Sequence, residues 1–297
     1  MIVVSQAPLP LSDHGDDIVA STRAALASGF DLISLPPALL RPEEVAEALA
    51  DVPARPAPEP AVWIGTIPDE SVYRAVFHAL AQRNVHLLND PEAHLEIFEF
   101  DRAYPKIADL TARSRVITDL AQIDDAIRDL GLPVFIKGSL LSRKHSGWRA
   151  CVADTADDLR RLAASLLRQR YLSRGRAVIR ELLPLRRFTV PAGDFPVGRE
   201  FRVFLLRGEP LAHGYYWPYT GDWAALSPAE ETAVLDLARR AARRFAAPLV
   251  ALDIGQLEDM SWRVIETGDP QFSGLSFIDP RTLWRNLAAR LSGTPHT

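Results

Sequence analysis

The sequence is short of cysteine and of lysine. Among its 297 residues the single cysteine is Cys151, and the lysines are Lys106, Lys137 and Lys144. One cysteine excludes an internal disulfide and is typical of a reducing compartment, so we expect a cytoplasmic protein with a buried, inert thiol. Because lysines are so few, the position of each one is informative.

An excess of basic charge and long apolar runs are also missing. The formal net charge is −4, with 47% hydrophobic and 24% charged residues, which is typical of a globular protein. This balance gives no reason to expect nucleic acid as an obligate partner. No run approaches 18 apolar residues and no basic segment opens the chain, so we expect neither a membrane span nor a secretory leader. Composition does not predict the oligomeric state.

The first hundred residues show strands that alternate with helices. Short apolar runs indicate strands at 2–4, 31–35, 61–65 and 85–88, and helical patterns between them cover 18–28, 42–50 and 69–83. This alternation predicts a small α/β unit with a parallel sheet. No glycine-rich phosphate loop follows any of these strands, so the unit is not an obvious dinucleotide-binding or P-loop domain.

A lysine-bearing strand and a polar loop follow. The pattern from 92 to 120 is helical, with Arg102 and Lys106 one turn apart. A buried strand at 134–136 then delivers Lys137 at its end, and the polar segment 139–147 precedes a further strand at 148–152. Strand, polar loop and strand are typical of a flap over phosphates. A hairpin with a solvated basic tip explains the same pattern equally well.

The middle of the chain offers a hinge and an arginine pair. A strand at 177–180 runs into Glu181, Leu182 and Leu183, which suits an interdomain hinge but also an ordinary strand end. After a loop at 186–196, a strand at 201–206 begins next to Arg199 and Arg202. Three residues apart on a strand, these two arginines point to opposite faces, so one can face an anion while the other pairs with an acid.

A hairpin near the C-terminus carries acids. Runs at 249–254 and 262–266 flank a turn, and they contain Asp253 and Glu266, with Asp269 just beyond. Side chains alternate along strands, so the register decides whether Asp253 and Glu266 meet. If Asp269 joins them, three hard oxygen donors converge, as Mg²⁺ prefers. The alternative is two turn residues and a glutamate on a solvated face.

The order of these parts resembles the ATP-grasp superfamily. The residues that carry the resemblance lie at 133–137, 178–181, 199–202, 252–253 and 264–266, and the similarity covers about 101–276. It implies a mixed α/β (α+β) ATP-grasp fold with an N-terminal α/β domain at 1–100. A central subdomain with a phosphate flap would span 101–185, and a C-terminal subdomain with metal-binding strands 186–297. The chain looks like a divergent branch of predicted peptide-type carboxylate–amine ligases.

The resemblance also implies ATP and Mg²⁺ as cofactors and a role for particular residues. The nucleotide-binding residues would be Lys137, Ser142, Glu181, Leu182, Leu183 and one of Arg102 and Lys106. The catalytic cations would be Lys144, Arg199 and Arg202, and the metal ligands Asp253, Glu266 and Asp269. The family commonly has an asparagine where this chain has Gly268, so Asp269 is the expected substitute.

The activity that the resemblance implies is ligation of a carboxylate to an amine through an acyl-phosphate. The substrates would be small molecules or peptides, and cations with Mg²⁺ would neutralise the anions that meet. An ATP-binding assembly or scaffold protein without ligase turnover is the alternative, and a plain two-domain α/β protein is a third. Residues 1–100 and the loop 186–196 are expected to shape the acceptor site. The exposed arginines at 160, 161, 168 and 170 indicate either an acidic substrate or a solvated helix face.

Overall fold

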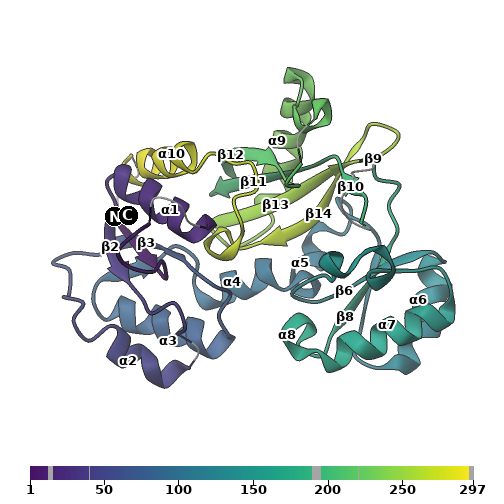
Figure 1. The fold of residues 1–297 in the computed structure, drawn as a ribbon, viewed down its shortest axis with the longest axis horizontal. Helices are drawn as coiled ribbons and strands as arrows, with labels where there is room; N and C mark the ends of the chain where they lie inside the picture. The colour runs from purple at the N-terminus through teal and green to yellow at the C-terminus, as the bar shows by residue number, and fades with distance from the viewer. Residues whose placement is uncertain (13–15, 40, 189–194, 220, 294–297) are drawn as a thin grey trace.

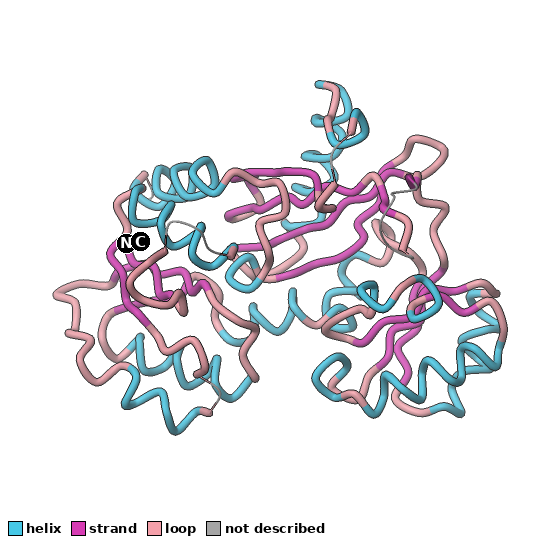
Figure 2. Tube along the Cα trace, viewed as in Figure 1, coloured by secondary structure: helices cyan, strands magenta, loops and turns pink. Residues whose placement is uncertain are grey.

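Three four-stranded sheets form the framework of the part of the chain that the computed structural model describes, residues 1–12, 16–39, 41–188, 195–219 and 221–293. Figure 1 places the N-terminal sheet below one end of the C-terminal sheet and the central sheet below the other end. Figure 2 shows the same three groups of strands with helices around them. None of the described helices has the length and apolarity that crossing a bilayer requires.

The N-terminal sheet is parallel. Its strands, in the order β2-β1-β3-β4, are β1 (Ile2–Ser5), β2 (Asp31–Ser34), β3 (Glu59–Ile64) and β4 (Val85–Leu87). Parallel neighbours need crossover connections, and α1 (Asp17–Ala27), α2 (Val45–Ala48) and α3 (Glu70–Ala81) lie in these connections. The prediction of a parallel α/β unit is therefore confirmed.

The central sheet is antiparallel. In the order β5-β8-β6-β7 it contains β5 (Ser114–Ile117), β6 (Val134–Gly138), β7 (Val152–Ala153) and β8 (Ala177–Glu181). The helices α6 (Ile123–Leu130) and α7 (Ala156–Arg168) pack on it through a shared apolar cluster. A short helix, α8 (Arg170–Ser173), follows α7.

Two local predictions in this region are corrected by the structure. A helical pattern was expected over 92–120, and the structure has helices α4 (Pro91–Phe98) and α5 (Phe100–Ile107) in the first part of this range. In the second part Ser114–Ile117 forms strand β5, which pairs with β8. The strand expected at 148–152 is reduced to β7, because Trp148–Ala150 forms a 3₁₀ turn. Both errors concern short segments whose conformation depends on a strand partner distant in the sequence.

The C-terminal sheet joins the other two. In the order β12-β11-β13-β14 it contains β11 (Glu200–Leu206), β12 (Glu209–Tyr215), β13 (Leu249–Gln256) and β14 (Trp262–Gly268). One face packs on α9 (Pro228–Ala242), and the other shares a core with α10 (Pro280–Ser292) and α1. A separate two-stranded ladder joins β9 (Arg187–Phe188) to β10 (Val197–Gly198). The N-terminal unit is thus packed against the C-terminal one.

The register of this sheet aligns three charged side chains. Asp253 lies opposite Glu266 across the β13–β14 pair, and Arg202 lies opposite Asp253 across β11–β13. A bulge interrupts the β13–β14 ladder immediately after Asp253. The prediction that Asp253 and Glu266 meet in register is confirmed, and Arg202 extends the row.

Candidate functional site

An ion pair joins the central and C-terminal sheets. Lys137 ends β6 with only 2% of its surface exposed, and its ammonium donates a hydrogen bond to the Glu266 carboxylate on β14. Burial lowers the pKa of Lys137, and the nearby Glu266 charge partly offsets this effect. Burial alone would raise the pKa of Glu266, but Lys137 and Lys144 outweigh it and bring the pKa to about 2. Glu266 is therefore ionised at neutral pH.

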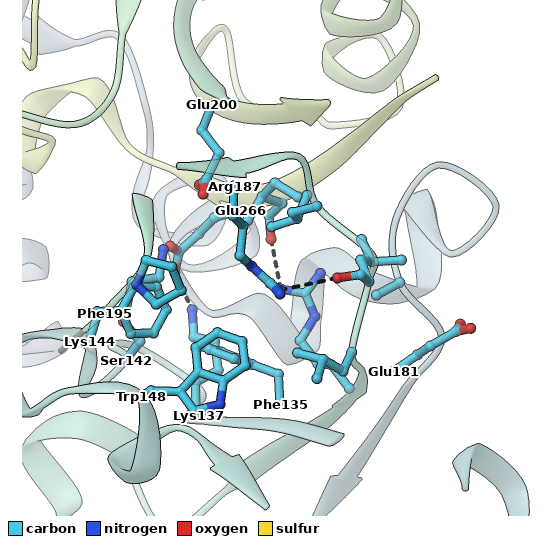
Figure 3. Close-up of a pocket in the computed structure, with 17 residues that line it drawn as sticks. Phe135, Lys137, Ser142, Lys144, Trp148, Glu181, Arg187, Phe195, Glu200 and Glu266 are labelled. Carbon is cyan, nitrogen blue, oxygen red and sulfur yellow. Dashed lines mark hydrogen bonds and ion pairs between the residues drawn. The ribbon is translucent and has the colours of Figure 1, made fainter. Parts of the chain in front are cut away.

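A cavity that we call the slot lies beside this pair (Figure 3). Its apolar lining comes from both sheets and the hinge, and includes Phe135, Leu182, Leu183, Leu185 and Ile265. Its charged lining includes Lys137, Lys144, Arg180, Arg187, Glu200 and Glu266. Figure 3 shows Lys137, Lys144 and Glu266 gathered on one side of the slot. An apolar pocket with a few convergent charged groups is typical of a small-molecule site.

The slot is narrow because an arginine occupies part of it. The Arg187 guanidinium lies 4.6 Å from the centre of the Trp148 ring and donates to the Leu183 carbonyl at 3.2 Å. The remaining open volume is about 60 Å³. Pockets for small molecules usually enclose roughly 300–1,000 Å³, so the open volume of the slot is smaller than a ligand of that kind fills.

The hinge residues lie where the sequence pattern placed them. Leu182 and Leu183 follow β8 directly, and within the described residues their backbone N–H groups donate to no partner. The Glu181 side chain pairs with Arg113 at 3.2 Å and in Figure 3 points away from Lys137. The two residues with these N–H groups line the slot, while the Glu181 carboxylate points away from Lys137.

A second cavity, which we call the large cavity, opens next to the slot. Its volume is about 980 Å³, and it shares Ser142, Lys144, Phe195 and Glu266 with the slot. The flap at 140–147 covers one side, and Asp17 and Ile67 of the N-terminal unit contribute at another. Of the loop 186–196, which was expected to shape an acceptor site, residues 189–194 lie outside the described residues. The two cavities therefore meet where Lys144 faces Glu266.

Two of the predicted catalytic cations face the large cavity. The Lys144 ammonium lies 5.2 Å from the Tyr216 ring and 5.3 Å from the Trp217 ring. Burial alone would lower the pKa of Lys144, but the electrostatic influence of Tyr216 and of the acids Glu200 and Glu266 outweighs burial and raises this pKa. The Arg202 guanidinium donates to both Asp253 oxygens, at 2.8 and 2.9 Å. Both side chains stay cationic and lie within reach of an anion in the cavity.

The third predicted cation, Arg199, lies elsewhere, on the opposite face of its strand from Arg202. Its guanidinium donates to Glu230 at the start of α9, to Gln256 and to the carbonyls of Trp223 and Ala225. Arg199 lines neither cavity. The arginine pair does divide between opposite faces, and Arg199 is the member that pairs with an acid.

The expected triad of carboxylates does not form in the described part of the chain, where no three metal-binding side chains gather. Asp269 is buried and accepts hydrogen bonds from His94 Nδ1 at 3.0 Å and from the Gln271 backbone N–H at 3.0 Å. Asp269 lines neither cavity, so the structure does not bring it together with Asp253 and Glu266. Asp253 and Glu266 remain side by side and border the large cavity. Two adjacent carboxylates suit Mg²⁺, which usually takes one or two from the protein and completes its shell with phosphates and water.

The two candidates for an upstream nucleotide-binding cation lie on α5, away from both cavities. Arg102 pairs with Glu99 at 2.7 Å, and the Lys106 ammonium pairs with Glu96. Neither Arg102 nor Lys106 lines the slot or the large cavity.

Arg180 is a cation of the slot that was not predicted from the sequence. It follows the apolar run of β8 and is 5% exposed. Its guanidinium donates to the Ile265 carbonyl at 2.7 Å and to Thr111 Oγ1 at 2.8 Å, and it lies 4.4 Å from the Phe100 ring. Burial lowers its pKa to about 10. The available signal was a charged residue at the end of an otherwise apolar strand.

Glu200 is another charged slot residue for which the sequence predicts no role. It is 3% exposed, and its Oε1 accepts a hydrogen bond from Trp217 Nε1 at 3.2 Å. Its Oε2 is buried without a partner among the described residues, and burial raises the pKa of this carboxyl group. A buried acceptor without a donor is costly, so an incoming donor at this position would be bound favourably.

Comparisons with known proteins agree with this geometry. One family model matches residues 123–287 of this chain. It describes an ATP-grasp domain and represents family 3 of one clade of these domains. No curated protein matches the sequence. Among solved structures, the RimK domain protein ATP-grasp from Sphaerobacter thermophilus DSM 20745 is 16% identical with a TM-score of 0.62, covering 97% of this chain and 98% of that one.

Two further solved structures are similar to this chain in fold. The ATP-grasp ligase PsnB, complexed with minimal precursor, Mg and ADP, is 17% identical with a TM-score of 0.60, covering 98% of this chain and 97% of that one. The D-alanine–D-alanine ligase from Bacillus anthracis, complexed with ATP, is 13% identical with a TM-score of 0.57, covering 92% and 85%. At such identities the similarity shows a common fold.

Proposed function

The chain belongs to the ATP-grasp domain family whose model it matches, and it has the ATP-grasp fold. From this premise we propose that the protein is an ATP- and Mg²⁺-dependent ligase that joins a carboxylate to an amine. One observation carries the proposal: the slot and the large cavity meet at Lys144 and Glu266. A nucleotide in the slot would place its γ-phosphate next to a second substrate in the large cavity. The substrates would be small molecules or peptides.

The slot supplies the groups that a nucleotide requires. The N–H groups of Leu182 and Leu183 would bind the edge of the base, and the apolar walls would contact its faces. The unpaired Glu200 oxygen would accept from ribose hydroxyls. Lys137 and Lys144 would bind phosphate oxygens with charge-assisted hydrogen bonds. Ser142 lies at the junction of the cavities, where its hydroxyl can donate to a phosphate.

Asp253 and Glu266 would hold Mg²⁺. Both carboxylates border the large cavity, and they now neutralise Arg202 and Lys137 respectively. The ion would supply charge neutralisation where a phosphoryl group and a carboxylate approach each other. When ATP and the metal bind, phosphate oxygens would replace the two acids as partners of Arg202 and Lys137. Asp253 and Glu266 would then be available to bind the metal.

The reaction has two steps. A substrate carboxylate oxygen attacks the γ-phosphorus of ATP, releasing ADP and forming an acyl-phosphate. The amine nitrogen then attacks the acyl carbon, phosphate leaves and the nitrogen loses a proton. Arg202 and Lys144 would orient the carboxylate and balance its charge. Flap residues 140–147 cover this region and would exclude water from the acyl-phosphate.

The test is release of ADP and phosphate by the purified protein against panels of carboxylates and amines, with mass spectrometry of the products. Turnover that requires both substrates and yields the condensed product is expected. Tight Mg-ATP binding without turnover on any pair would favour an ATP-binding assembly protein. Absence of Mg-ATP binding, judged by thermal stabilisation with and without EDTA, would contradict both.

A further inference from the structure

A hollow on the outer side of the flap is lined by four arginines. One wall of the hollow is formed by residues between 143 and 150, which include the end of the flap, and the other wall by α7. The hollow has a volume of about 470 Å³ and shares no lining residue with the slot. Its polar lining consists of Arg143, Ser146 and Arg149 on one side and Arg161, Ser165 and Arg168 on the other. Every one of these polar side chains offers hydrogen-bond donors, and no carboxylate lines the hollow.

The four arginines of the hollow outnumber the acids that pair with them in the described part of the chain. Within the described residues, Arg149 and Arg168 make no ion pair or hydrogen bond through their side chains. Arg143 donates only to Ser165 Oγ, at 3.1 Å, and Arg161 pairs with Asp158 at 3.0 Å. The guanidinium groups of Arg143 and Arg168 therefore have no acidic partner among these residues, and Arg161 and Arg149 both act on the single carboxylate of Asp158, which lowers its pKa. All four guanidinium groups line one concave space. A solvated helix face would spread like charges apart, whereas this arrangement brings them together from two elements.

The lining matches an anion with several acceptor oxygens. Guanidinium groups bind phosphate oxygens in pairs of hydrogen bonds, and hydroxyl groups add single ones. Donors on two opposite walls suit a group whose oxygens point in several directions, as in phosphate. We infer that this hollow is a binding site for phosphate or a phosphoryl group, held between the flap and α7.

The site is connected to the flap. Arg143 directly precedes Lys144, which lines both the slot and the large cavity, and Ser146 lines both the hollow and the large cavity. An anion bound by both walls would fix the flap to α7 and thereby restrain the segment that carries Lys144. This inference does not depend on the proposed ligase activity.

The experiment is calorimetric titration of the full-length protein with inorganic phosphate and, separately, with O-phosphoserine, in about 150 mM chloride to screen weak surface attraction. The test variant is Arg149→Gln with Arg168→Gln. The matched control is Arg170→Gln with Arg285→Gln, which removes the same charge from two exposed arginines outside the hollow. Melting curves of both variants report whether they fold.

We expect the wild-type and control proteins to bind phosphate equally and the test variant to bind it at least tenfold more weakly. Binding of both probes would identify the ligand as an organic phosphoryl group, and binding of phosphate alone as the free ion. Equal affinity in all three proteins, or no binding by the wild type, would overturn the inference. Equal affinity would also be the result if phosphate bound only at Lys137 and Lys144.

Trypsin provides an independent measurement on the flap. Cleavage after Arg143 and Lys144 should be slowed at least threefold by saturating phosphate in the wild-type and control proteins. The same phosphate should leave cleavage of the test variant unchanged. Cleavage at the same rate with and without phosphate in all three proteins would contradict an anion held between the flap and α7.

Discussion

Lys137 and Glu266, which are 129 residues apart in the sequence, form an ion pair across the space between the central and C-terminal sheets. Both side chains line the slot, and Glu266 also lines the large cavity. Each charge is kept in place by the other until a ligand arrives. The pair therefore places one cation and one acid at the same position, where the proposed function requires a phosphate-binding group and a metal ligand.

Replacement of Lys137 by Met should weaken Mg-ATP binding at least tenfold, because a charge-assisted hydrogen bond contributes about 1.5–3 kcal/mol. Titration calorimetry with a non-hydrolysable ATP analogue measures the effect, and a melting curve reports the folded state. Lys106→Met is the matched comparison, since its ammonium pairs with Glu96 outside both cavities. Affinity within twofold of wild type is expected for Lys106→Met. Equal losses for both lysines would contradict the placement of the phosphates.

The two acids Glu266 and Asp269 should respond differently when their charge is removed. Glu266→Gln should raise the Mg²⁺ concentration needed for half-maximal ATP binding at least tenfold, because a carboxylate that faces the large cavity is lost. Asp269→Asn should leave this concentration within twofold. It should instead lower the melting temperature by a few degrees, because His94 and Gln271 lose a buried charged acceptor.

The control for this pair is the melting curve of Glu266→Gln measured without nucleotide. A metal requirement that moves equally in both variants would restore Asp269 as a ligand. Loss of stability without any change in the Mg²⁺ requirement in either variant would exclude both acids.

Local patterns in the sequence were sufficient for much of the fold and for part of the site. The hairpin containing Asp253 and Glu266, the end of the strand at Lys137 and the hinge at Leu182 each depend on residues that are close in the chain. Strand alternation and turn composition encode such features directly. These residues lie in or beside the cavities as expected.

The remaining features depend on packing between distant segments. Asp269 was expected beside Glu266, but the buried His94 ring, 175 residues away, accommodates its carboxylate. Arg187 was treated as part of a loop, yet its contact with Trp148 narrows the slot. The sequence does not contain these pairings as a local pattern, because a charged side chain selects its partner only after the sheets have packed.

Replacement of Glu200 by Gln should weaken ATP binding more than binding of 3′-deoxy-ATP. The unpaired Glu200 oxygen is proposed to accept from ribose hydroxyls, and an amide nitrogen at that position cannot accept. Competition binding with the two nucleotides gives the ratio of affinities, which should approach one in Glu200→Gln. Burial raises the pKa of Glu200, so this carboxylate is protonated at a higher pH than an ordinary one when the solution is acidified. The preference of the wild-type protein for ATP over 3′-deoxy-ATP should therefore begin to fall at that higher pH. A ratio unchanged by the substitution would exclude this contact.

Glu230 should stabilise the fold through Arg199 and contribute nothing to ATP binding. The hydrogen bond from Arg199 is the main cause that brings the pKa of Glu230 to about 2, below its ordinary value of 4.5. A carboxyl group whose pKa is lower in the folded protein stabilises it above the unfolded value, and this contribution is lost as the pH falls from about 4.5 towards 2. Glu230→Gln should lower the free energy of unfolding at pH 7 by about 1–3 kcal/mol, since it leaves Arg199 without its acid.

Urea unfolding of Glu230→Gln from pH 7 to pH 3 measures this contribution. The difference from the wild-type protein should shrink as the pH falls from about 4.5 towards 3, because the Glu230 carboxyl group of the unfolded chain is then protonated while that of the folded protein stays ionised. Glutamine still completes the capping box with Ser227, so the substitution isolates the ion pair from the helix cap. Glu231→Gln is the control, because its partner His213 lies at the surface and such pairs contribute about 0–1 kcal/mol. If Glu230→Gln weakened ATP binding without lowering stability, Arg199 would regain the catalytic role first expected for it.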